Sequence, residues 1–321
     1  MKAIIHERYG RPDVLELREV DIPVVEDDQV LVRVHAASVN PVEWYGVTGP
    51  YFARIGNGLR KPKDMTVGGD LAGRVEAVGS EVKGLQPGDE VFGTSGSSWA
   101  EYTCAREARL ARKPANVSFE EAAAVPVAAL TALQALRDKG KVQPGQRVLI
   151  NGASGGVGTF AVQLAKSFGA DVTAVCSTRN VEQARSLGAD RVIDYTQEDF
   201  TKGEGRYDLM LDIAGSRSFL ACRPVLTPEA TFVLVGGKMT YRGLGPLPHI
   251  AGTILKSKRR SQAVTFFMAK INTEDLEFLG ELLEAGTVKS VIDRRYELSQ
   301  APDALRYLGE GHARGKVVIT V

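Results

Sequence analysis

The 321-residue sequence has few of the residues that bind metals or cross-link chains. Its three cysteines, Cys104, Cys176 and Cys222, are far apart and form no Cys-x-x-Cys pair, and its four histidines are equally dispersed. Zinc sites and disulfide scaffolds need such residues at short spacings, so no metal site is expected. Each cysteine is most simply a small, buried hydrophobic residue.

The sequence also lacks an excess of charge and a long apolar segment. Lys and Arg number 40 and Asp and Glu number 39, so no overall field would attract nucleic acid or an anionic membrane. No apolar run is long enough to span a bilayer, and none follows a basic start. We therefore expect a cytoplasmic protein without a nucleic-acid or membrane partner. The length predicts about two domains.

A glycine-rich segment at 151–159 reads Asn-Gly-Ala-Ser-Gly-Gly-Val-Gly-Thr. The apolar run 148–150 precedes it, and residues 160–166 are apolar at helical spacing. A strand, a glycine turn and a helix in this order are typical of dinucleotide binding, because the helix N-terminus attracts the pyrophosphate. A side chain at Gly155 would obstruct that ligand, and one at Gly158 would push the helix off the strand. The predicted pyrophosphate site is Gly152, Ala153, Ser154, Gly155, Gly156, Val157 and Gly158. A tight turn without a ligand is the alternative.

The pattern of expected secondary structure differs between two parts of the chain. The first hundred residues are short β-like runs broken by turns. After a capping box formed by Ser118 and Glu121, strands and helices alternate: strands are expected at 148–151, 171–176, 191–193, 209–211 and 231–235, with helices at 156–168, 181–187 and near Ser218. This alternation predicts a parallel sheet covered on both faces. A helix at 274–284, a strand at 291–296, a helix at 301–308 and a strand at 316–320 are expected to return to the first domain.

The predicted fold class is therefore α/β, with a Rossmann-type doubly wound parallel sheet at 119–262. The remaining residues, 1–118 and 263–321, form a second, mostly β domain in this prediction.

The end of the predicted second strand carries no carboxylate. NAD-binding units place Asp or Glu there to hold the adenosine ribose, but this sequence continues Ser177-Thr178-Arg179. Hydroxyl and guanidinium groups suit a ribose 2′-phosphate, which a carboxylate would repel. The sequence thus predicts NADPH rather than NADH. The alternative for Arg179 is a solvated residue at a helix start.

Further motifs are spread over almost the whole chain: Tyr-Gly-Arg-Pro-Asp-Val-Leu at 9–15, Ala-Ala-Ser-Val-Asn-Pro at 36–41, Gly-Gly-Asp-Leu-Ala-Gly at 68–73, Gly-Ala-Asp at 188–190 and Gly-Lys-Val-Val at 315–318. Together they resemble the zinc-free medium-chain dehydrogenase/reductase superfamily, specifically its quinone oxidoreductase (zeta-crystallin-like) branch. The resemblance implies that the mostly β domain is a GroES-like catalytic domain. Zinc-dependent members carry ligands at the positions of Asn40, Gly69 and Val127, and none of these three residues can bind zinc.

The resemblance also implies where the cofactor lies. It places the nicotinamide site at Asn40, Tyr45, Tyr51 and Thr131 and at the backbone of Val235, Gly236 and Gly237. It places the 2′-phosphate site at Ser177, Arg179 and Tyr195. The stretch between Tyr51 and Gly68 is longer and more basic than in compact quinone reductases, so the substrate's size is not implied.

The missing zinc ligands limit the class of substrate that the enzyme is expected to reduce. Reducing a simple ketone requires an acid or a Lewis acid at the oxygen, whereas a quinone or an α,β-unsaturated carbonyl spreads its charge onto an oxygen that hydrogen bonds can stabilise. Tyr45 and Tyr51 are the expected donors, with aromatic packing as their alternative role. Asn40 is expected to position the nicotinamide ribose or the substrate, with a turn role as its alternative.

The predicted function is NADPH-dependent reduction of small-molecule quinones or enones. A broader carbonyl or enoyl-thioester reductase is the alternative within the enzyme class. A non-catalytic NADPH-binding protein, crystallin-like or a sensor, is the alternative outside it. The near-neutral charge disfavours RNA binding.

An apolar, β-prone run at Val264–Met268 would be an aggregation hazard as an open edge strand. The resemblance implies that it pairs with its copy in a second subunit, which predicts a homodimer. The alternative is an internal strand of the return segment.

Overall fold

The computed structural model describes residues 1–237, 247–257 and 261–321, and these form two compact units. The first unit holds Met1–Leu130 and Lys270–Val321. The second holds the described residues from Thr131 to Ala269. Within the described part of the chain, no helix combines the length and the apolar character needed to cross a membrane.

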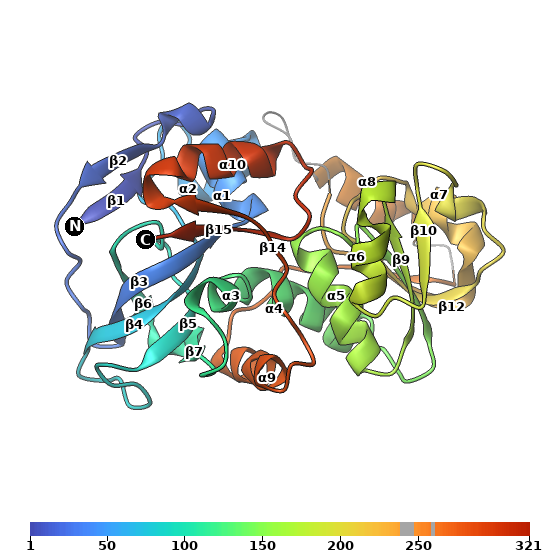
Figure 1. The fold of residues 1–321 in the computed structure, drawn as a ribbon. Coiled ribbons are helices and arrows are strands. Elements are labelled where there is room, and N and C mark those ends of the chain that lie inside the picture. Colours follow the sequence, from blue (N-terminus) through green and yellow to red (C-terminus); the bar gives the residue numbers. More distant parts are fainter. Residues whose placement is uncertain (238–246, 258–260) are drawn as a thin grey trace. The chain divides into compact units, whose positions relative to one another are not determined.

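The first unit is built on a seven-stranded sheet of order β14-β15-β3-β4-β5-β7, with β6 paired to β3 (Figure 1). Every pairing is antiparallel except that of β14 with β15. A two-stranded sheet of β1 and β2 completes the β structure. The strands are β1 (Lys2–Ile5), β2 (Glu16–Glu19), β3 (Gln29–Val39), β4 (Asp70–Val78), β5 (Glu90–Thr94), β6 (Tyr102–Arg106), β7 (Leu110–Arg112), β14 (Ile292–Glu297) and β15 (Lys316–Thr320).

Strand register in this sheet brings the ends of three strands together. Val317 lies opposite Val39, so the start of β15 faces the end of β3. Leu71 lies opposite Ala37 on the other side of β3. The start of β4, the end of β3 and the start of β15 therefore lie side by side, although β15 comes from the far end of the chain. Apolar side chains of the sheet, including Val30, Val32 and Leu110, form the core beneath.

The helices of the first unit are α1 (Pro41–Thr48), α2 (Tyr51–Asn57), α3 (Phe119–Ala123), α9 (Thr273–Glu284) and α10 (Ala301–Gly309). Helix α1 packs against α10 so closely that a Cβ atom at Gly309 would lie 2.0 Å from the Trp44 ring. The predicted capping box is confirmed: Glu121 N donates to Ser118 Oγ, and Ser118 N donates to Glu121 Oε2.

The second unit contains an all-parallel, six-stranded sheet of order β10-β9-β8-β11-β12-β13. This is the strand order of the doubly wound dinucleotide-binding fold, so the predicted fold class is confirmed. Helices α5 and α6 lie in front of the strands in Figure 1. The elements are β8 (Arg147–Asn151), α5 (Gly156–Ser167), β9 (Asp171–Cys176), α6 (Val181–Ser186), β10 (Arg191–Asp194), β11 (Tyr207–Asp212), α7 (Phe219–Cys222), β12 (Leu226–Leu234), α8 (Leu247–Ser257) and β13 (Ala263–Phe266), and α4 (Pro126–Gln134) crosses the boundary between the units.

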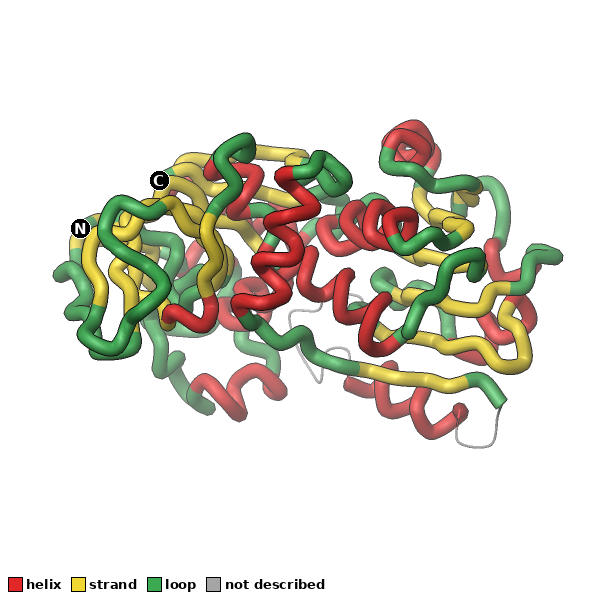
Figure 2. Tube along the Cα trace, turned by 90° about the horizontal axis from the view of Figure 1, so that it is seen from below, coloured by secondary structure: helices red, strands yellow, loops and turns green. Residues whose placement is uncertain are grey.

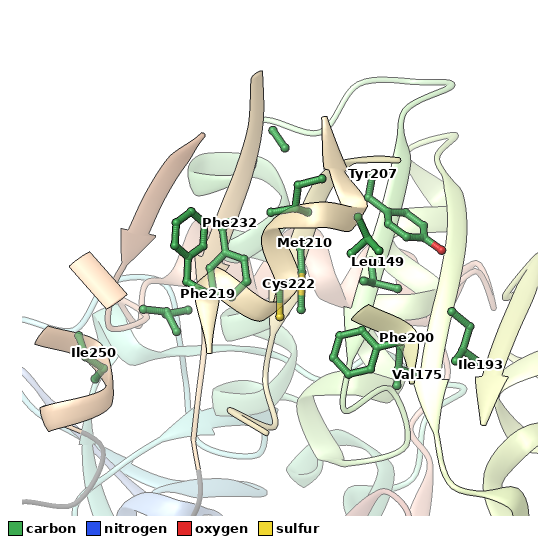
Figure 3. Packing of buried hydrophobic residues seen from close by; sticks show 14 residues of the cluster. Leu149, Val175, Ile193, Phe200, Tyr207, Met210, Phe219, Cys222, Phe232 and Ile250 are labelled. Atoms are coloured by element: carbon green, nitrogen blue, oxygen red, sulfur yellow. The ribbon is translucent and has the colours of Figure 1, made fainter. Parts of the chain in front are cut away.

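One face of this sheet packs on a buried apolar cluster (Figure 3). Phe219 and Phe232 meet edge to face with ring centroids 5.4 Å apart. Cys222 is fully buried in the cluster, and burial raises the pKa of its thiol to about 12. Burial likewise raises the pKa of Cys176 to about 11. Both thiols are therefore packed and unreactive at neutral pH, as the sequence predicts.

The compact units begin and end at other residues than the predicted domains. Helix α3, which starts directly after residue 118, lies in the first unit, where Phe119 stacks on His35 with ring centroids 4.2 Å apart. Strand β13 pairs in parallel with β12 and is the outermost strand of the Rossmann sheet (Figure 2). The predicted boundary after residue 262 puts β13 in the return segment, whereas the compact unit that contains the Rossmann sheet extends to Ala269. A capping box marks where a helix starts, and an apolar run marks a strand, but neither says which core the element will cover.

Candidate active site

A cavity of about 330 Å³ opens within the first unit. Helix α1, the segment 64–69, the turn after β5, Val127 and Ile271 line it. The lining is mostly apolar, and its polar members include Glu43 and Thr94. A concave, largely apolar site with a few polar groups is the usual form of a small-molecule site.

A buried polar cluster lies directly behind this wall, centred on Asp70. Its carboxylate accepts hydrogen bonds from Ser38 Oγ (2.6 Å), Asn40 Nδ2 (2.9 Å) and the backbone N of Val127 (2.9 Å). Lys316 Nζ lies 3.3 Å from Asp70 Oδ2 and also donates to Asn40 Oδ1. Buried charges persist when they are paired and fully hydrogen-bonded, and this cluster meets both conditions.

Asn40 is a member of that cluster rather than a free ligand. Its side chain is 3 % exposed, and both ends of its amide are engaged, one with Asp70 and the other with Lys316. It is also the N-cap residue of α1, so its backbone departs from β3 at this point. These contacts favour a structural role for Asn40 over the expected contact with substrate or nicotinamide ribose.

Glu43 occupies the first turn of α1 and is 5 % exposed. Its Oε2 accepts a hydrogen bond of 2.6 Å from the backbone N of Asn40, whereas its Oε1 has no hydrogen-bond partner among the described residues. Burial, and then the nearby Asp70 carboxylate, raise the pKa of Glu43 to about 7, although Lys316 opposes the shift. A carboxyl group that titrates near neutral pH at a cavity wall is a candidate for proton transfer.

The two predicted tyrosines lie outside the set of residues that line the cavity. Tyr45 is half-buried on α1 and packs edge to face on Phe52, with ring centroids 5.1 Å apart. Its burial raises the pKa of its hydroxyl. Tyr51 begins α2 and is 69 % exposed. Aromatic packing, the alternative considered for both, therefore describes Tyr45, and Tyr51 presents its ring to solvent in this unit.

In the second unit, the glycine turn has the geometry expected of a phosphate cradle. Gly152 adopts a φ of +93°, in the region that favours glycine. A Cβ atom at Gly158 would lie 2.1 Å from Gly152 O, so this position requires glycine for packing alone. At Gly155 a Cβ atom would meet only Gly152 O, at 3.9 Å. The space beside Gly155 is thus open at the N-terminus of α5, where backbone N–H groups of Gly156 and Val157 are suited to a pyrophosphate.

The predicted 2′-phosphate residues gather around a short helical turn after β9. Asn180 Nδ2 donates to Ser154 Oγ (3.0 Å) and to Ser177 Oγ (3.2 Å), which ties this turn to the glycine turn. Arg179 is exposed on the same turn. Tyr195, 57 % exposed, follows β10 and donates its backbone N–H to Cys176 O. The residues present therefore fit a phosphorylated ribose.

A carboxylate does approach this turn from β10, but it is already engaged. Asp194 accepts hydrogen bonds from Thr178 Oγ1 (2.6 Å) and from the hydroxyl and backbone N of Thr196. These bonds lower the pKa of Asp194, the bond from Thr178 most. The charge of Asp194 is therefore satisfied locally by the two threonines.

Val235, Gly236 and Gly237 follow the carboxyl end of β12, where doubly wound sheets bind ligands. Val235 N and Gly236 N both donate to Asp212 O, at 3.0 and 3.3 Å, which fixes the chain leading to Gly237. Thr131 lies half-buried on α4. The Asp212 side chain accepts hydrogen bonds from Asn151 and Gly215, so it braces this edge of the sheet.

Comparison with known proteins places this geometry in a family. The family described as alcohol dehydrogenase GroES-like domain matches residues 26–135, and that described as zinc-binding dehydrogenase matches residues 187–319. A 2-methylene-furan-3-one reductase of Solanum lycopersicum is 37 % identical over 99 % of this chain and 79 % of its own length. The chain belongs to the medium-chain dehydrogenase/reductase superfamily, in its quinone oxidoreductase branch.

Two further relatives support this assignment. The chloroplastic NADPH-dependent alkenal/one oxidoreductase of Arabidopsis thaliana is 35 % identical over 99 % of this chain and 79 % of its own length. The solved structure of the quinone oxidoreductase from Coxiella burnetii superimposes with a TM-score of 0.87 at 32 % identity, covering 100 % of this chain and 99 % of that one.

The zinc-ligand positions of this superfamily carry other functions here. Asn40 and the backbone of Val127 hold Asp70. Gly69 leaves room for Glu43, since a Cβ atom at Gly69 would lie 2.8 Å from Glu43 Oε1. Across the described ranges, no three His, Cys, Asp or Glu side chains gather as a metal site would require.

Sequence reasoning missed several residues of this site. Glu43, Thr94 and Lys316 were not among the predicted site residues, nor was Asn180 of the second unit. Glu43 carries one local signal, because an acid three residues after Asn40 completes half of a capping box. The position of Lys316 beside Asp70 depends on strand pairing and has no local signal.

Proposed function

We propose that this protein reduces the conjugated double bond of enones, or the ring of quinones, with NADPH and without zinc. The observation that carries this proposal is the mostly apolar cavity of the first unit, which Gly69 and Val127 line at two of the superfamily's zinc-ligand positions. Asn40, at the third position, is hydrogen-bonded to Asp70 and Lys316. A conjugated acceptor needs hydrogen bonding rather than a Lewis acid at its oxygen. The relatives named as quinone and alkenal/one reductases support this substrate class.

When bound, NADPH supplies a hydride. In our proposal, the glycine turn Gly152–Gly158 holds its pyrophosphate, and Ser177, Arg179 and Tyr195 hold its 2′-phosphate. Thr131, Val235, Gly236 and Gly237 face its nicotinamide end. In the first unit, the apolar walls of the cavity exclude water from the acceptor. Polar side chains at the wall stabilise, by hydrogen bonding, the negative charge that develops on the acceptor's oxygen.

The test is consumption of NADPH and NADH by metal-free protein with a simple quinone and a simple enone as acceptors. We expect turnover that resists a chelator and prefers NADPH. Loss of activity with chelator would contradict the zinc-free mechanism. Preference for NADH would contradict the role of Arg179, and tight NADPH binding without turnover of any acceptor would favour a non-catalytic protein.

We also propose a homodimer joined through β13, in a protein located in the cytoplasm. Strand β13 has a partner, β12, on one side only among the described strands. Phe266 is 38 % exposed and Met268 is 81 % exposed beside it. An open apolar edge favours pairing with another strand. A monomer mass by light scattering at micromolar concentration would refute the dimer.

A further inference from the structure

Among the described residues that line the cavity, Glu43 is the one acidic residue that is buried and has a hydrogen-bond partner for only one of its two carboxyl oxygens. Its Oε2 is fixed by the backbone N of Asn40 at 2.6 Å. Its Oε1 has no partner among the described residues and lies 2.8 Å from where a Cβ atom of Gly69 would be. Both Glu43 and Gly69 line the cavity. This Oε1 oxygen is itself buried, and the absence of a side chain at Gly69 leaves space beside it.

A second buried polar atom at the same cavity is also unsatisfied. Thr94, at the end of β5, is 4 % exposed, and its Oγ1 has no partner in the described part of the molecule. Buried polar groups in proteins are nearly always hydrogen-bonded. The two atoms belong to different elements, α1 and β5, whose residues line the same cavity.

The charges around Glu43 favour its protonated form. Asp70 from β4 raises its pKa, and Lys316 from β15 lowers it by less than burial raises it. His6, Asp64 and Arg109 are the other titratable or charged residues among those lining the cavity. Burial and Asp70 thus raise the pKa of Glu43 to about 7, so its protonated form persists to higher pH than that of an exposed glutamate.

We propose that Glu43 and Thr94 form a subsite for the carbonyl oxygen of the acceptor, with Glu43 as its proton donor. This assignment rests on the proposed function. Reduction of an enone adds a hydride, with its electron pair, at the β-carbon and leaves negative charge on the oxygen. The proton of Glu43 moves from Oε1 to that oxygen, and its bonding pair stays on the carboxylate. The carboxylate then takes a proton from water, so each turnover consumes one proton from solvent.

The first test is Glu43→Gln. Glutamine can still accept the hydrogen bond from Asn40 N, so the fold should persist, but it cannot release a proton. We expect the rate of enone reduction to fall by about 10²-fold or more. The wild-type rate should decline as pH rises through about 7, and that inflection should be missing in the variant. Glu76→Gln, at an exposed position on β4, is the matched control and should match the wild type.

A measurement without cofactor or substrate isolates Glu43. The infrared C=O band of a protonated carboxylic acid should disappear in the cofactor-free wild type as pH is raised through about 7. It should be missing from Glu43→Gln and present in Glu76→Gln. Thr94→Val should slow turnover about tenfold while leaving this band and its midpoint in place, since it removes only the second donor.

The outcomes separate this inference from the proposed function. Wild-type turnover with an unchanged pH profile in Glu43→Gln would overturn the proton-donor role and leave the reductase standing. No titrating band in the wild-type protein would overturn it as well. A wild-type protein that reduces neither quinones nor enones would overturn both.

Discussion

Lys316 and Asp70 form an ion pair in the interior of the first unit, with Nζ 3.3 Å from Oδ2 and 3 % and 0 % of their side chains exposed. They come from β15 and β4, which both pair with β3. The pair thus joins the last strand of the chain to its central sheet, directly behind the wall that carries Glu43.

Removing one partner of this pair should be costly. Lys316→Met leaves the Asp70 charge buried with only neutral donors, which we expect to lower the free energy of unfolding by about 3 kcal/mol. Urea denaturation measures the loss. The double variant Lys316→Met with Asp70→Asn removes both charges and should recover part of the stability. A single variant as stable as the wild type would show that the three neutral donors satisfy Asp70 unaided.

Two glycines of the cofactor turn should respond differently to the same substitution. Gly155→Ala meets open space in the protein, so it should cost about 1 kcal/mol of stability or less. It should nevertheless weaken NADPH binding at least about tenfold, because the methyl group occupies the phosphate cradle. Fluorescence titration measures the affinity, and thermal unfolding of the cofactor-free protein measures the stability.

Gly158→Ala is the counterpart. Its methyl group would lie 2.1 Å from Gly152 O and close to the Ala153 backbone, so the cofactor-free protein should lose about 3 kcal/mol. If Gly155→Ala bound NADPH as tightly as the wild type does, the glycine turn would serve helix packing rather than phosphate binding.

Arg179 should set the preference between the two nicotinamide cofactors. Arg179→Gln removes the guanidinium but keeps a polar side chain, and we expect the Kd for NADPH to rise about 10- to 100-fold. The Kd for NADH should change little, because it has no 2′-phosphate. Arg185→Gln on α6, whose guanidinium pairs with Glu182, is the control for general loss of positive charge. Equal losses for both cofactors would refute the phosphate contact.

Local patterns predicted most of the second unit. The glycine turn, α5 and β9 were expected within a residue or two of their observed bounds, because turn chemistry and periodicity act over neighbouring residues. Strand β15 was also expected at Lys316–Thr320. Local patterns do not predict which sheet β13 joins, because they indicate a strand but not the strands with which it pairs.

The candidate site of the first unit was harder to predict. Helices α1 and α2 were not expected, although Asn40-Pro41 is a helix start and Gly49 ends α1 with a φ of +60°. The chemistry of Glu43 depends on Asp70 and Lys316, which strand pairing brings from distant parts of the chain. The pKa of Glu43 depends mainly on how deeply its side chain is buried, and burial is a property of the fold.

Glu43 should also make stability depend on pH in a defined direction. Its pKa rises from 4.5 to about 7 on folding, so the folded state holds its proton more tightly than the unfolded state. Below pH 4.5 both states are protonated and the group costs nothing. As pH rises from 4.5 to about 7, only the unfolded state loses the proton, and stability falls by about 3 kcal/mol.

Comparison with Glu43→Gln isolates this contribution, because other titrating groups cancel in the difference. Relative to the wild type, the variant should gain about 3 kcal/mol of stability between pH 4.5 and pH 8, with most of the change complete by pH 7. Denaturation curves at several pH values give this difference, and Glu76→Gln should show none. A constant difference between wild type and Glu43→Gln across that range would mean that Glu43 ionises normally in the folded protein, and its assignment as proton donor would fail with it.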